Sequence, residues 1–593
     1  MLNKEGRPTA PEAITAAPAA TFTGNRALAI EEALIFEIGR PDVMGVDIDQ
    51  PPAFKPRLGG QARKAPLNLP GLSEPETMRH YVRLSRQNYA IDMGLYPLGS
   101  CTMKHNPRLN EKMARLPGFA DVHPLQPLST VPGAVDLIAE VGRWLIELTG
   151  MAAVAMSPKA GAHGEACGMM AIKAALAARG EAEKRKKVLV PLSAHGTNPA
   201  TAALLGLEVV DVPGRPDGTV DPEVVASLLN DEVAALMLTN PNTCGLFERD
   251  IVAIAKAVHK AGAYLYADGA NFNAIVGKVR PGDLGVDAMH INLHKTFSTP
   301  HGGGGPGAGP VVLSPALAPF APLPFVRIRR GRAELVESAP AKASRPAKGK
   351  YPNPKDPAWV AFLESAAKAV TISYGDLEAV VPGADLSTAE IEDIYAAIDE
   401  AGANIAADDH STPGHPFGRL TAFHGQMGMF TRAMAYMLSH GADGLRQASE
   451  DAVLNANYVR ACLKDIFSQP FGDRVCMHEV LFDDRFLDGT GVTTLDFAKA
   501  MIDEGYHPMT MYFPLVVHGA MLIEPTESES LASLDLFIAA LRDLAMRAKA
   551  GGKEALFKAA PQFAPRRRLD ETRAARAPRL KWEPPAPYVE AAE

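Results

Sequence analysis

Hydrophobic and polar positions over residues 130–330 form short apolar runs that alternate with helix-length stretches. The apolar runs predict strands at Val188–Pro191, Leu207–Val212, Ala234–Leu238, Ala263–Ala267, Ala288–Leu293 and Pro310–Leu313. The stretches between them predict helices at Ala166–Ala178, Asp221–Leu229 and Arg249–Ala261. This alternation predicts an α/β fold with a mostly parallel sheet wrapped by helices. Sheets of this kind bind their ligands at the carboxyl ends of the strands.

Polar or glycine-containing segments closely follow four of these strands. The segments are Ser193–Asn198, Thr239–Asn242, Asp268–Asn271 and His294–Lys295. Because the carboxyl ends of parallel strands meet at one edge of a sheet, we expect these groups to converge there. Four polar strand ends indicate a binding site more strongly than any one of them alone.

The rest of the chain divides by composition into further segments. Residues 8–22 are rich in Ala, Pro and Thr, which is typical of a disordered leader. Residues 338–356 form a Pro/Ala/Lys-rich linker, and a long helical pattern covers Leu420–Leu463. We predict a disordered leader at 1–29, an N-terminal segment at 30–125, a large domain at 126–335, a linker and acidic helical insertion at 338–415, a smaller α/β C-terminal domain at 416–565 and a tail at 566–593.

Composition narrows the classes of partner. The chain has 593 residues and a net charge of −8, so nothing global favours nucleic acid or an anionic membrane. No apolar run approaches the roughly 20 residues of a membrane span. The five cysteines form no CxxC pair, which suits a reducing cytoplasm and argues against a structural zinc site. We expect a cytoplasmic protein with no metal site.

Lys295 ends the apolar run Ala288–Leu293 and precedes a glycine-saturated turn. A bare Lys–Gly pairing usually marks a surface lysine beside a flexible loop. Here the preceding run is expected to be buried, and an idle buried charge is costly. A buried lysine is also a nucleophile that forms Schiff bases with carbonyl cofactors. Lys295 is therefore a candidate pyridoxal-phosphate lysine.

Asp268 and His195 each follow a predicted strand and fit the same cofactor. An aspartate there keeps the ring nitrogen of pyridoxal phosphate protonated, although Asp268 alone is more typical of a turn or helix cap. The candidate lysine at the end of the next strand reverses that preference. The flat ring of His195 is suited to stack on a cofactor ring, an interpretation that depends on the other residues around it.

Two further segments leave alternatives open. Ser157–Glu165 precedes the predicted helix start at Ala166, and such small-residue turns expose N–H groups to phosphate, although the motif alone is weak. Tyr96–Lys104 gathers hydroxyls, a thiol and an amine. It is either an anion or substrate clamp or a turn with a buried cysteine.

Several of these motifs resemble those of glycine decarboxylase, the P-protein of the glycine cleavage system. The resemblance covers roughly residues 30–335 and 416–565. The segment Leu34–Arg40 is similar to subunit 2 of the two-subunit form, and the chain is too short for the fused form. The matching motifs are Tyr96–Lys104, Ser193–Pro199, Tyr266–Asn273, His294–Gly307, His507–Pro514 and Glu524–Glu527.

The resemblance implies a fold-type I enzyme with pyridoxal 5'-phosphate held covalently on Lys295. Asp268 would then pair with the pyridinium nitrogen and His195 would stack on the ring. The turn with Ala162 and His163 would seat the phosphate, with His163 standing where a glutamine is usual. The remaining expected cofactor contacts are Thr197, Asn242 and His294, and the expected substrate-side residues are Ser100, Cys101 and Thr102.

The implied reaction releases CO2 from glycine and transfers the aminomethyl group to the lipoyl arm of H-protein. The implied assembly is an α2β2 heterotetramer with a companion subunit 1. Another fold-type I decarboxylase or aminotransferase would need an arginine clamp and would leave Ser100–Lys104 and Glu524–Glu527 unexplained. A catalytically silent scaffold subunit would have no need of Lys295.

The insertion departs from this family. Phe362–Asp409 resembles the acidic region 1.1 of bacterial primary sigma factors, beginning at Thr371–Leu377, continuing through Leu386–Ile394 and ending at Asp408 and Asp409. Such a module would dock on a basic partner of unknown identity. A surface insertion without a partner is an equally good interpretation, since loops accept long insertions at little cost.

Overall fold

The structure, a computed structural model, describes most of the chain. The described residues are 32–40, 57–65, 69–301, 307–329, 332–336, 356–369, 414–421, 423–564 and 567–581, with isolated residues or short runs between 43 and 52 and between 371 and 406. The predicted leader at 1–29 and much of the predicted insertion lie outside them. The chain divides into two compact units. Unit 1 contains Met1–Pro97, Asp484–Met511 and Ser530–Glu593, and unit 2 contains Leu98–Asp483 and Tyr512–Glu529.

A seven-stranded sheet forms the centre of unit 2, in the order β1-β7-β6-β5-β4-β2-β3. Its five consecutive strands β2 to β6 run parallel, while β7 runs antiparallel to both of its neighbours. The predicted mostly parallel sheet is therefore confirmed. The strands are β1 (Ala153–Ala155), β2 (Lys187–Pro191), β3 (Glu208–Val212), β4 (Val233–Thr239), β5 (Tyr264–Gly269), β6 (Ala288–Ile291) and β7 (Val311–Leu313).

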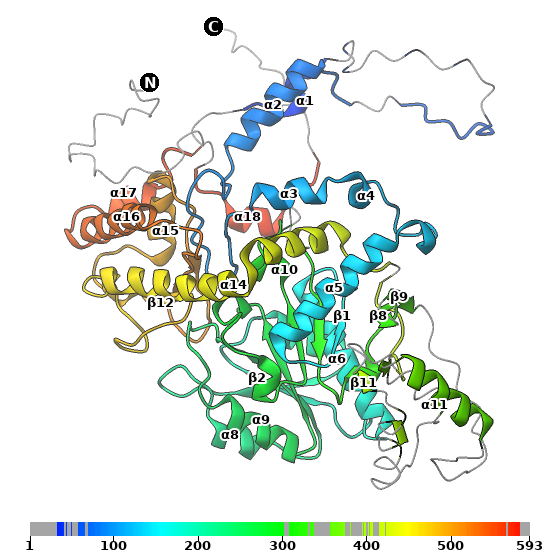
Figure 1. Cartoon of the computed structure of the whole chain (residues 1–593). Helices are drawn as coiled ribbons and strands as arrows, with labels where there is room; N and C mark the ends of the chain where they lie inside the picture. Colours follow the sequence, from blue (N-terminus) through cyan, green and yellow to red (C-terminus); the bar gives the residue numbers. More distant parts are fainter. Residues whose placement is uncertain are drawn as a thin grey trace. The chain divides into compact units, whose positions relative to one another are not determined.

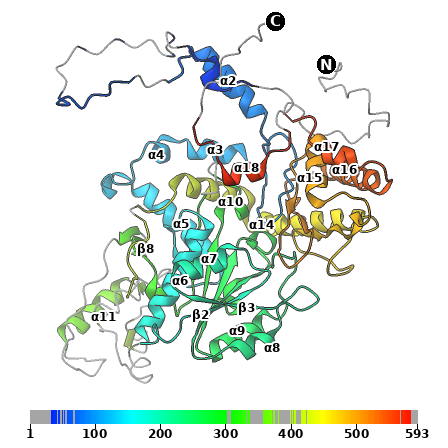
Figure 2. The same cartoon turned by 180° about the vertical axis from the view of Figure 1, so that it is seen from behind.

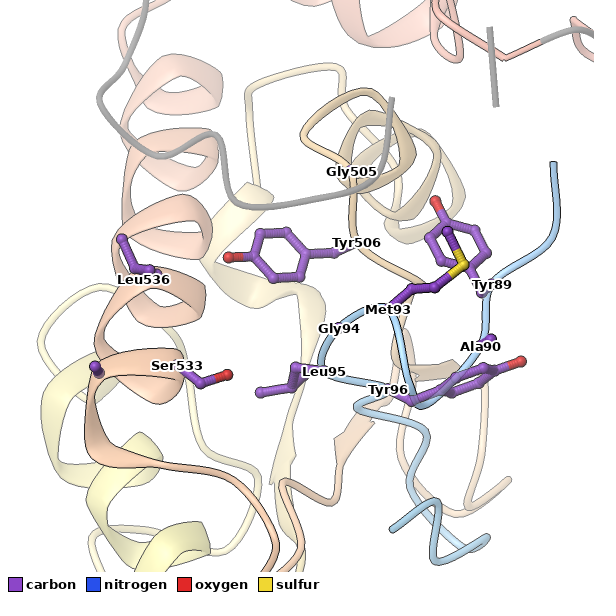
Figure 3. A pocket seen from close by; sticks show the side chains of 11 residues that line it. Tyr89, Ala90, Met93, Gly94, Leu95, Tyr96, Gly505, Tyr506, Ser533 and Leu536 are labelled. Atoms are coloured by element: carbon purple, nitrogen blue, oxygen red, sulfur yellow. The ribbon is translucent and has the colours of Figure 1, made fainter. Parts of the chain in front are cut away.

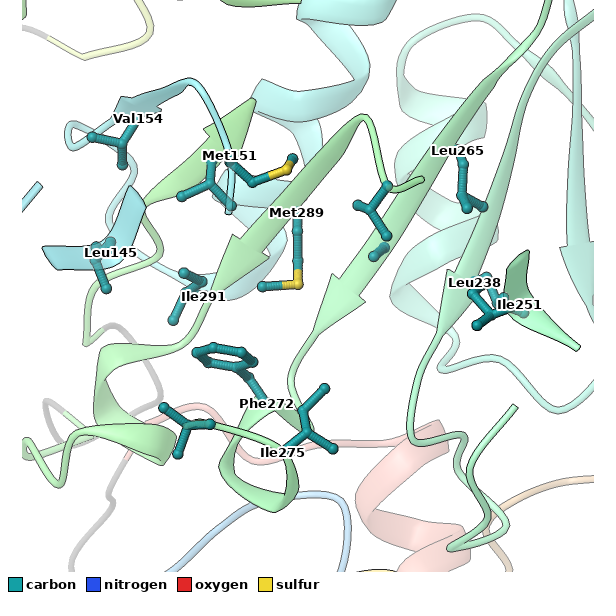
Figure 4. Close-up of a cluster of buried hydrophobic side chains, with 14 of the residues drawn as sticks. Leu145, Met151, Val154, Leu238, Ile251, Leu265, Phe272, Ile275, Met289 and Ile291 are labelled. Atoms are coloured by element: carbon teal, nitrogen blue, oxygen red, sulfur yellow. The ribbon is translucent and has the colours of Figure 1, made fainter. Parts of the chain in front are cut away.

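Helices cover both faces of this sheet, as Figures 1 and 2 show from opposite sides. Successive strand residues point to opposite faces, so Met289 joins one core cluster and Ala288 the other. Figure 4 shows the first cluster, in which Leu265, Phe272 and Met289 are buried together. Helices α5, α9 and α14 contribute to that cluster, and α6 and α7 contribute to the other. The helices of the sheet region are α5 (Pro132–Thr149), α6 (Gly161–Ala178), α7 (Thr197–Leu204), α8 (Pro222–Leu228) and α9 (Ile251–Lys260).

Two element boundaries differ from the predictions in ways that matter for the site. Helix α6 begins at Gly161, not at Ala166, so the segment expected to be a turn is the first turn of the helix. Strand β6 ends at Ile291, and the residues beyond Asn292 form the one-turn helix α10 (Leu293–Thr296).

The remaining elements of unit 2 include the long helix α14, in which the backbone of Gly441 leaves helical geometry. Two antiparallel pairs, β8 with β9 and β12 with β14, lie outside the main sheet, and β10 pairs parallel with β11. The elements are α3 (Arg108–Ala114), α4 (Pro117–Ala120), α10, α11 (Pro357–Ala369), α14 (Met427–Leu463), β8 (Phe325–Arg329), β9 (Arg332–Val336), β10 (Thr371–Ser373), β11 (Asn404–Ala406), β12 (Val480–Phe482) and β14 (Met521–Ile523), with short 3-10 turns at Leu128–Thr130, Phe272–Ala274, Pro281–Leu284 and Ala318–Phe320.

The described part of the predicted insertion has a small core of its own. Trp359 and Phe362 of α11 pack with Ile394 and Ile398, and all four side chains are buried. Most of the predicted stretch Leu386–Ile394 lies outside the described residues.

Unit 1 is largely helical in its described part. Helix α15 packs on α16 and α17, and it begins with a capping box formed by Thr493 and Asp496. A cavity of about 300 Å³ in this unit is lined mainly by tyrosine and aliphatic side chains, including Tyr89, Tyr96 and Tyr506; Figure 3 shows them. The elements are α1 (Ile35–Ile38), α2 (Glu74–Arg86), α15 (Thr494–Asp503), β13 (Thr510–Met511), α16 (Leu531–Lys549), α17 (Glu554–Ala559) and α18 (Glu571–Arg576), with a 3-10 turn at Asp484–Leu487.

No helix among the described residues has both the length and the apolar composition needed to cross a bilayer.

Candidate active site

The carboxyl ends of β4, β5 and β6 lie side by side and bring their polar residues together. In the strand register, Thr239 of β4 faces Asp268 of β5, and Asp268 faces His290 of β6. The strands come very close here. A Cβ atom on Gly269 would lie only 1.8 Å from the carbonyl oxygen of His290, so only glycine fits at this position. Helix α10 starts two residues after β6 and carries His294 and Lys295. Residues that are far apart in the sequence thus lie together at the carboxyl ends of the strands, the edge of the sheet where they are expected.

Lys295 is buried, with 9% of its surface exposed. Its Nζ donates a hydrogen bond to the carbonyl oxygen of Ser100, at 2.9 Å. No carboxylate of the described residues lies within ion-pair distance of this nitrogen. Among the described residues, the direct hydrogen-bond partner of this amine is therefore a neutral carbonyl and not a carboxylate. Attachment to a carbonyl cofactor would use this amine as a nucleophile, as the sequence predicts.

Asp268 is a buried carboxylate held ready for a cation. Its Oδ1 accepts a hydrogen bond from the Ala270 N–H at 2.9 Å, and its Oδ2 accepts one from Asn198 Nδ2 at 3.1 Å. Burial opposes ionisation of Asp268, but the positive field of His290, the Ala270 N–H and Lys295 outweigh it and lower the pKa. The carboxylate therefore stays ionised, which suits a protonated ring nitrogen.

His290 and Asn198 are neighbours of Asp268 that the sequence analysis did not single out. His290 Nδ1 pairs with the Tyr266 hydroxyl at 2.6 Å, and its Nε2 lies 2.9 Å from Asn292 Oδ1 and 3.4 Å from Asp268 Oδ1. Burial lowers the pKa of His290. A histidine in the middle of an otherwise apolar buried strand was the signal that could have revealed this residue.

Two helix N-termini border the cluster. The first N–H groups of α6, at Gly161, Ala162 and His163, have no acceptor inside the helix and are available to an anion. The helix start reaches β6 because Gly161 and Gly164 carry no side chain; a Cβ on Gly164 would lie 2.9 Å from His290 Cβ. The first helical residue of α7 is Thr197.

The two histidines near these helix starts are oriented by backbone N–H groups. His163 Nδ1 accepts a hydrogen bond from the Lys159 N–H, and His195 Nδ1 accepts one from the Thr197 N–H, both at 3.2 Å. The exposed ring of His195 meets Phe513 edge-on, with centroids 5.4 Å apart. It lies within electrostatic range of both Asp268 and Lys295. A flat exposed ring at this position is consistent with stacking on a cofactor.

Asn242 and His294, two predicted cofactor contacts, have other partners. Asn242 Oδ1 accepts hydrogen bonds from two N–H groups of its own loop, and its Nδ2 donates to Glu248 Oε1 at 2.7 Å. His294 is buried between the Ala308 N–H and Asn292. Burial, with help from His301, lowers the pKa of His294 to about 3, so its ring is neutral. Direct cofactor contact by these two residues stays a prediction.

The Ser100–Thr102 loop is fixed at both ends. The Ser100 N–H donates to Glu479 Oε2 at 2.8 Å, and Thr102 Oγ1 donates to Glu524 Oε1 at 2.6 Å. Ser100 has a positive φ of 62°, which is uncommon for a residue with a side chain. Cys101 Sγ lies 3.8 Å from His301 Nδ1, and burial raises the pKa of the thiol. Of the open alternatives for this segment, the contact of Lys295 with Ser100 favours a loop that belongs to the site.

The site fits pyridoxal phosphate on observations of the chain itself. The cofactor needs an amine, an anion for its ring nitrogen, a flat neighbour and donors for its phosphate. Lys295, Asp268 and His195 would supply the first three, and the N-terminus of α6 would supply the donors.

Two family models match the chain. The model for aminotransferase class V matches residues 163–305, and the model for the C-terminal domain of glycine dehydrogenase matches residues 448–560. Among solved structures, the chain is similar to the crystal structure of glycine decarboxylase (P-protein) of the glycine cleavage system in inhibitor-bound form. The TM-score is 0.58 at 20% identity, covering 82% of this chain and 93% of that one. It is also similar to the sphingosine-1-phosphate lyase of Burkholderia pseudomallei, with a TM-score of 0.53 at 13% identity, 85% coverage of this chain and 98% of the other. These likenesses confirm the predicted fold.

Curated relatives match over nearly the whole chain. A probable glycine dehydrogenase (decarboxylating) subunit 2 of Caulobacter vibrioides is 60% identical over the full length of both proteins. A protein of the same description from Caldanaerobacter subterraneus is 42% identical, over 93% of this chain and 98% of its own length. At such identity and coverage, this chain belongs to the family of glycine dehydrogenase (decarboxylating) subunit 2.

Proposed function

We propose that this chain decarboxylates glycine with pyridoxal phosphate bound covalently to Lys295, and that the remaining aminomethyl group passes to the lipoyl arm of H-protein. The observation that carries this proposal is the buried Lys295, which shares one sheet edge with the ionised Asp268. Membership of a family whose relatives are described as glycine dehydrogenase (decarboxylating) supports the choice of reaction.

When bound, the cofactor draws electrons from the substrate into its protonated ring. Asp268 holds the proton on the ring nitrogen, because its own carboxyl stays ionised in the buried site. His195 would offer its flat ring to the cofactor, and the first N–H groups of α6, at Gly161 to His163, would hold the phosphate. Thr197, the first residue of α7, would add a hydroxyl to the cofactor contacts.

Ser100 to Thr102 form the substrate side. Their positions relative to Lys295 are fixed by the hydrogen bond from Lys295 Nζ to the Ser100 carbonyl. Cys101 is part of this loop, and burial raises the pKa of its side chain, so it stays a thiol. The thiolate, not the thiol, is the reactive form of cysteine. The loop therefore bounds the space beside Lys295 without offering a competing nucleophile.

The partners in this proposal follow from the family. The description of the relatives as subunit 2 supports a companion subunit 1, and we propose an α2β2 assembly that receives lipoylated H-protein. None of the five cysteines, all of which lie among the described residues, forms a disulfide, which supports a reducing compartment, the cytoplasm. The acidic insertion at 338–415 stays a candidate docking module. Deleting residues 345–412 and finding unchanged assembly, glycine cleavage and interaction profile would remove the docking hypothesis.

The test is exchange of labelled bicarbonate into glycine by the purified chain, with and without companion subunit and lipoylated H-protein. We expect exchange with all components present. Lys295→Ala should abolish both the exchange and the Schiff-base absorption band of the cofactor while leaving the fold intact. Lys278→Ala, which removes an exposed lysine paired with Glu450, is the matched control. Absence of exchange in the complete mixture would refute the proposed function.

A further inference from the structure

Glu479 and Glu524 form a buried carboxyl pair behind the Ser100–Thr102 loop. Both side chains are fully buried, with 0% exposure. Strands β12 and β14 are antiparallel, and Val480 of β12 faces Ile523 of β14. Because Glu479 precedes Val480 and Glu524 follows Ile523, the two glutamates stand at the same end of the strand pair. An oxygen of each carboxyl and a ring nitrogen of His478 all lie within 4.8 Å of one another.

Each carboxyl holds one end of the loop that contacts Lys295. Glu479 accepts the Ser100 N–H at 2.8 Å, and Glu524 accepts the Thr102 hydroxyl at 2.6 Å. The carbonyl of the same Ser100 accepts from Lys295 Nζ at 2.9 Å. The pair is therefore one peptide away from Lys295, and it keeps Ser100 in a left-handed conformation that the surroundings must impose.

Two carboxylates this close together and out of water cannot both be ionised at low cost. Burial raises the pKa of Glu524 well above its usual range, with further contributions from Glu479 and Glu527 that outweigh the Thr102 hydroxyl and Lys295. Burial also raises the pKa of Glu479 to about 7, against the Ser100 N–H, Lys295 and Asn271.

His478 does not balance the charge of the pair. Neither nitrogen of its fully buried ring has a hydrogen-bond partner among the described residues, and Nε2 stands 3.8 Å from Glu524 Oε1. Burial, and then Lys295, lower the pKa of His478 to about 3, so the ring is neutral. Among the described residues, Lys295 is the cation that acts on both carboxyls, so protons on the carboxyls themselves must balance the remaining charge.

We propose that Glu479 and Glu524 are a proton-holding pair that positions the Ser100–Thr102 loop against Lys295. Glu524 keeps a proton and anchors Thr102 as a neutral acid. Glu479, which accepts N–H groups of Ser100 and Asn271, is the member of the pair that loses its proton as the pH rises, and it anchors Ser100. Both are positioning residues, acting on Lys295 through the Ser100 peptide. The inference rests on the proposed function only in taking Lys295 as the cofactor lysine.

The test uses the full chain assembled with its companion subunit. Infrared difference spectra recorded without cofactor, as the pH is raised through 7, report the carbonyl stretch of protonated carboxylic acids. Glu479→Gln should remove one titrating acid from the wild-type difference spectrum. Glu524→Gln copies the neutral acid and should keep the Glu479 titration. Asp496→Asn, a buried carboxyl in unit 1 that is ionised in a capping box, is the matched control and should leave the titration unchanged.

The same variants are compared with cofactor bound. Glu524→Gln should keep the KM for glycine within about twofold, whereas Glu524→Ala should raise it about tenfold or more, because Thr102 loses its acceptor. Glu479→Gln should also flatten the dependence of the Schiff-base absorption band on pH near neutrality. A purely structural role for Glu479 would leave this pH profile as in the wild type.

Three results would each contradict the proposed role of Glu479 and Glu524. They are a neutral titration that persists in Glu479→Gln, a Glu524→Gln variant as impaired as Glu524→Ala, and a stoichiometric divalent cation that copurifies with the wild type and is lost in Glu524→Gln. The cofactor-free spectra separate this inference from the proposed function. If the titrations behave as expected but the complete mixture shows no glycine exchange, only the function fails.

Discussion

Lys104 and Glu527, 423 residues apart in the chain, form a buried ion pair with 2.6 Å between Nζ and Oε1. The same ammonium donates to the carbonyl of Thr296, the residue after Lys295, and to Asn273 Oδ1. Burial opposes the charge on Lys104, but Glu527 and Tyr436 outweigh it and raise the pKa. Lys104 thus links the loop at 98–106 to helix α10. Its ammonium group has an acceptor for each of its three N–H donors.

Lys104→Met should therefore destabilise the protein by about 3 kcal/mol, because it leaves Glu527 buried without its partner. The measurement is the free energy of unfolding in urea. Lys184→Met, which breaks an exposed pair with Asp231, should change it by less than about 1 kcal/mol. Lys104→Met combined with Glu527→Gln should recover part of the loss. A double variant no more stable than Lys104→Met would contradict the ion-pair account.

Asp268→Asn should lower kcat by at least about a hundredfold, because a neutral amide cannot hold the proton on the ring nitrogen. Stopped-flow and steady-state assays of glycine cleavage measure this effect, and the absorption spectrum reports whether the cofactor is still bound. Asn198→Ala removes a hydrogen bond to the same carboxylate but keeps its charge, so its loss should be much smaller. Equal losses in the two variants would refute a charge-based role for Asp268.

Glu165 should make the protein less stable as the pH rises. Burial, and then the like charge of Asp268, raise the pKa of Glu165 from 4.5 to about 8. Below pH 4.5 this carboxyl is protonated in both the folded and the unfolded chain. Between pH 4.5 and about 8, Glu165 ionises only in the unfolded chain, so its contribution to the free energy of unfolding is lost across that interval. Above about pH 8 the contribution no longer changes.

Glu165→Gln should remove that loss, which is on the order of a few kcal/mol. The check is the free energy of unfolding measured at several pH values between 4.5 and 8, with Glu183→Gln, an exposed carboxylate, as the control. The prediction is wrong if wild type and Glu165→Gln show parallel pH profiles.

Gly269→Ala should be strongly destabilising, by about 2 kcal/mol or more, because its Cβ would lie 1.8 Å from the His290 carbonyl oxygen and force β5 away from β6. Gly133→Ala is the control. Its Cβ would meet nothing within 4 Å, and it lies in the first turn of α5, so it should be neutral or slightly stabilising. Thermal unfolding distinguishes the two, and a tolerated Gly269→Ala would show that the strand ends are less tightly packed than described.

The sequence allowed the parallel strands and the central pair Lys295 and Asp268 to be predicted, because apolar runs and the polar residues after them are local patterns. Strand direction is not local, so the antiparallel β7 could not be distinguished from its parallel neighbours. The sequence predicts a start of α6 that is five residues too late, because glycines usually indicate a loop. Here Gly161 and Gly164 lie in the first turn of the helix, and they are glycines because the space next to β6 admits no side chain.

The groups that set the charge state of the site were harder to predict. Glu479 and Lys104 act on residues hundreds of positions away in the chain, and no spacing rule connects them. Glu524 and Glu527 entered the sequence analysis only through a family motif. Their roles as acceptors for Thr102 and Lys104 appear only when β14 is paired with β12.

Unit 1 is assembled from three stretches of chain, the first ending at Pro97 and the last beginning at Ser530. During synthesis at roughly 5–20 residues per second, the first stretch must wait on the order of half a minute to two minutes before its last partner leaves the ribosome. The central sheet of unit 2 is formed by one continuous stretch, Ala153–Leu313, and has no such delay. The sheet and Lys295 should thus fold first, while the early helices of unit 1 remain exposed to chaperones and proteases until the stretch that begins at Ser530 has been synthesised.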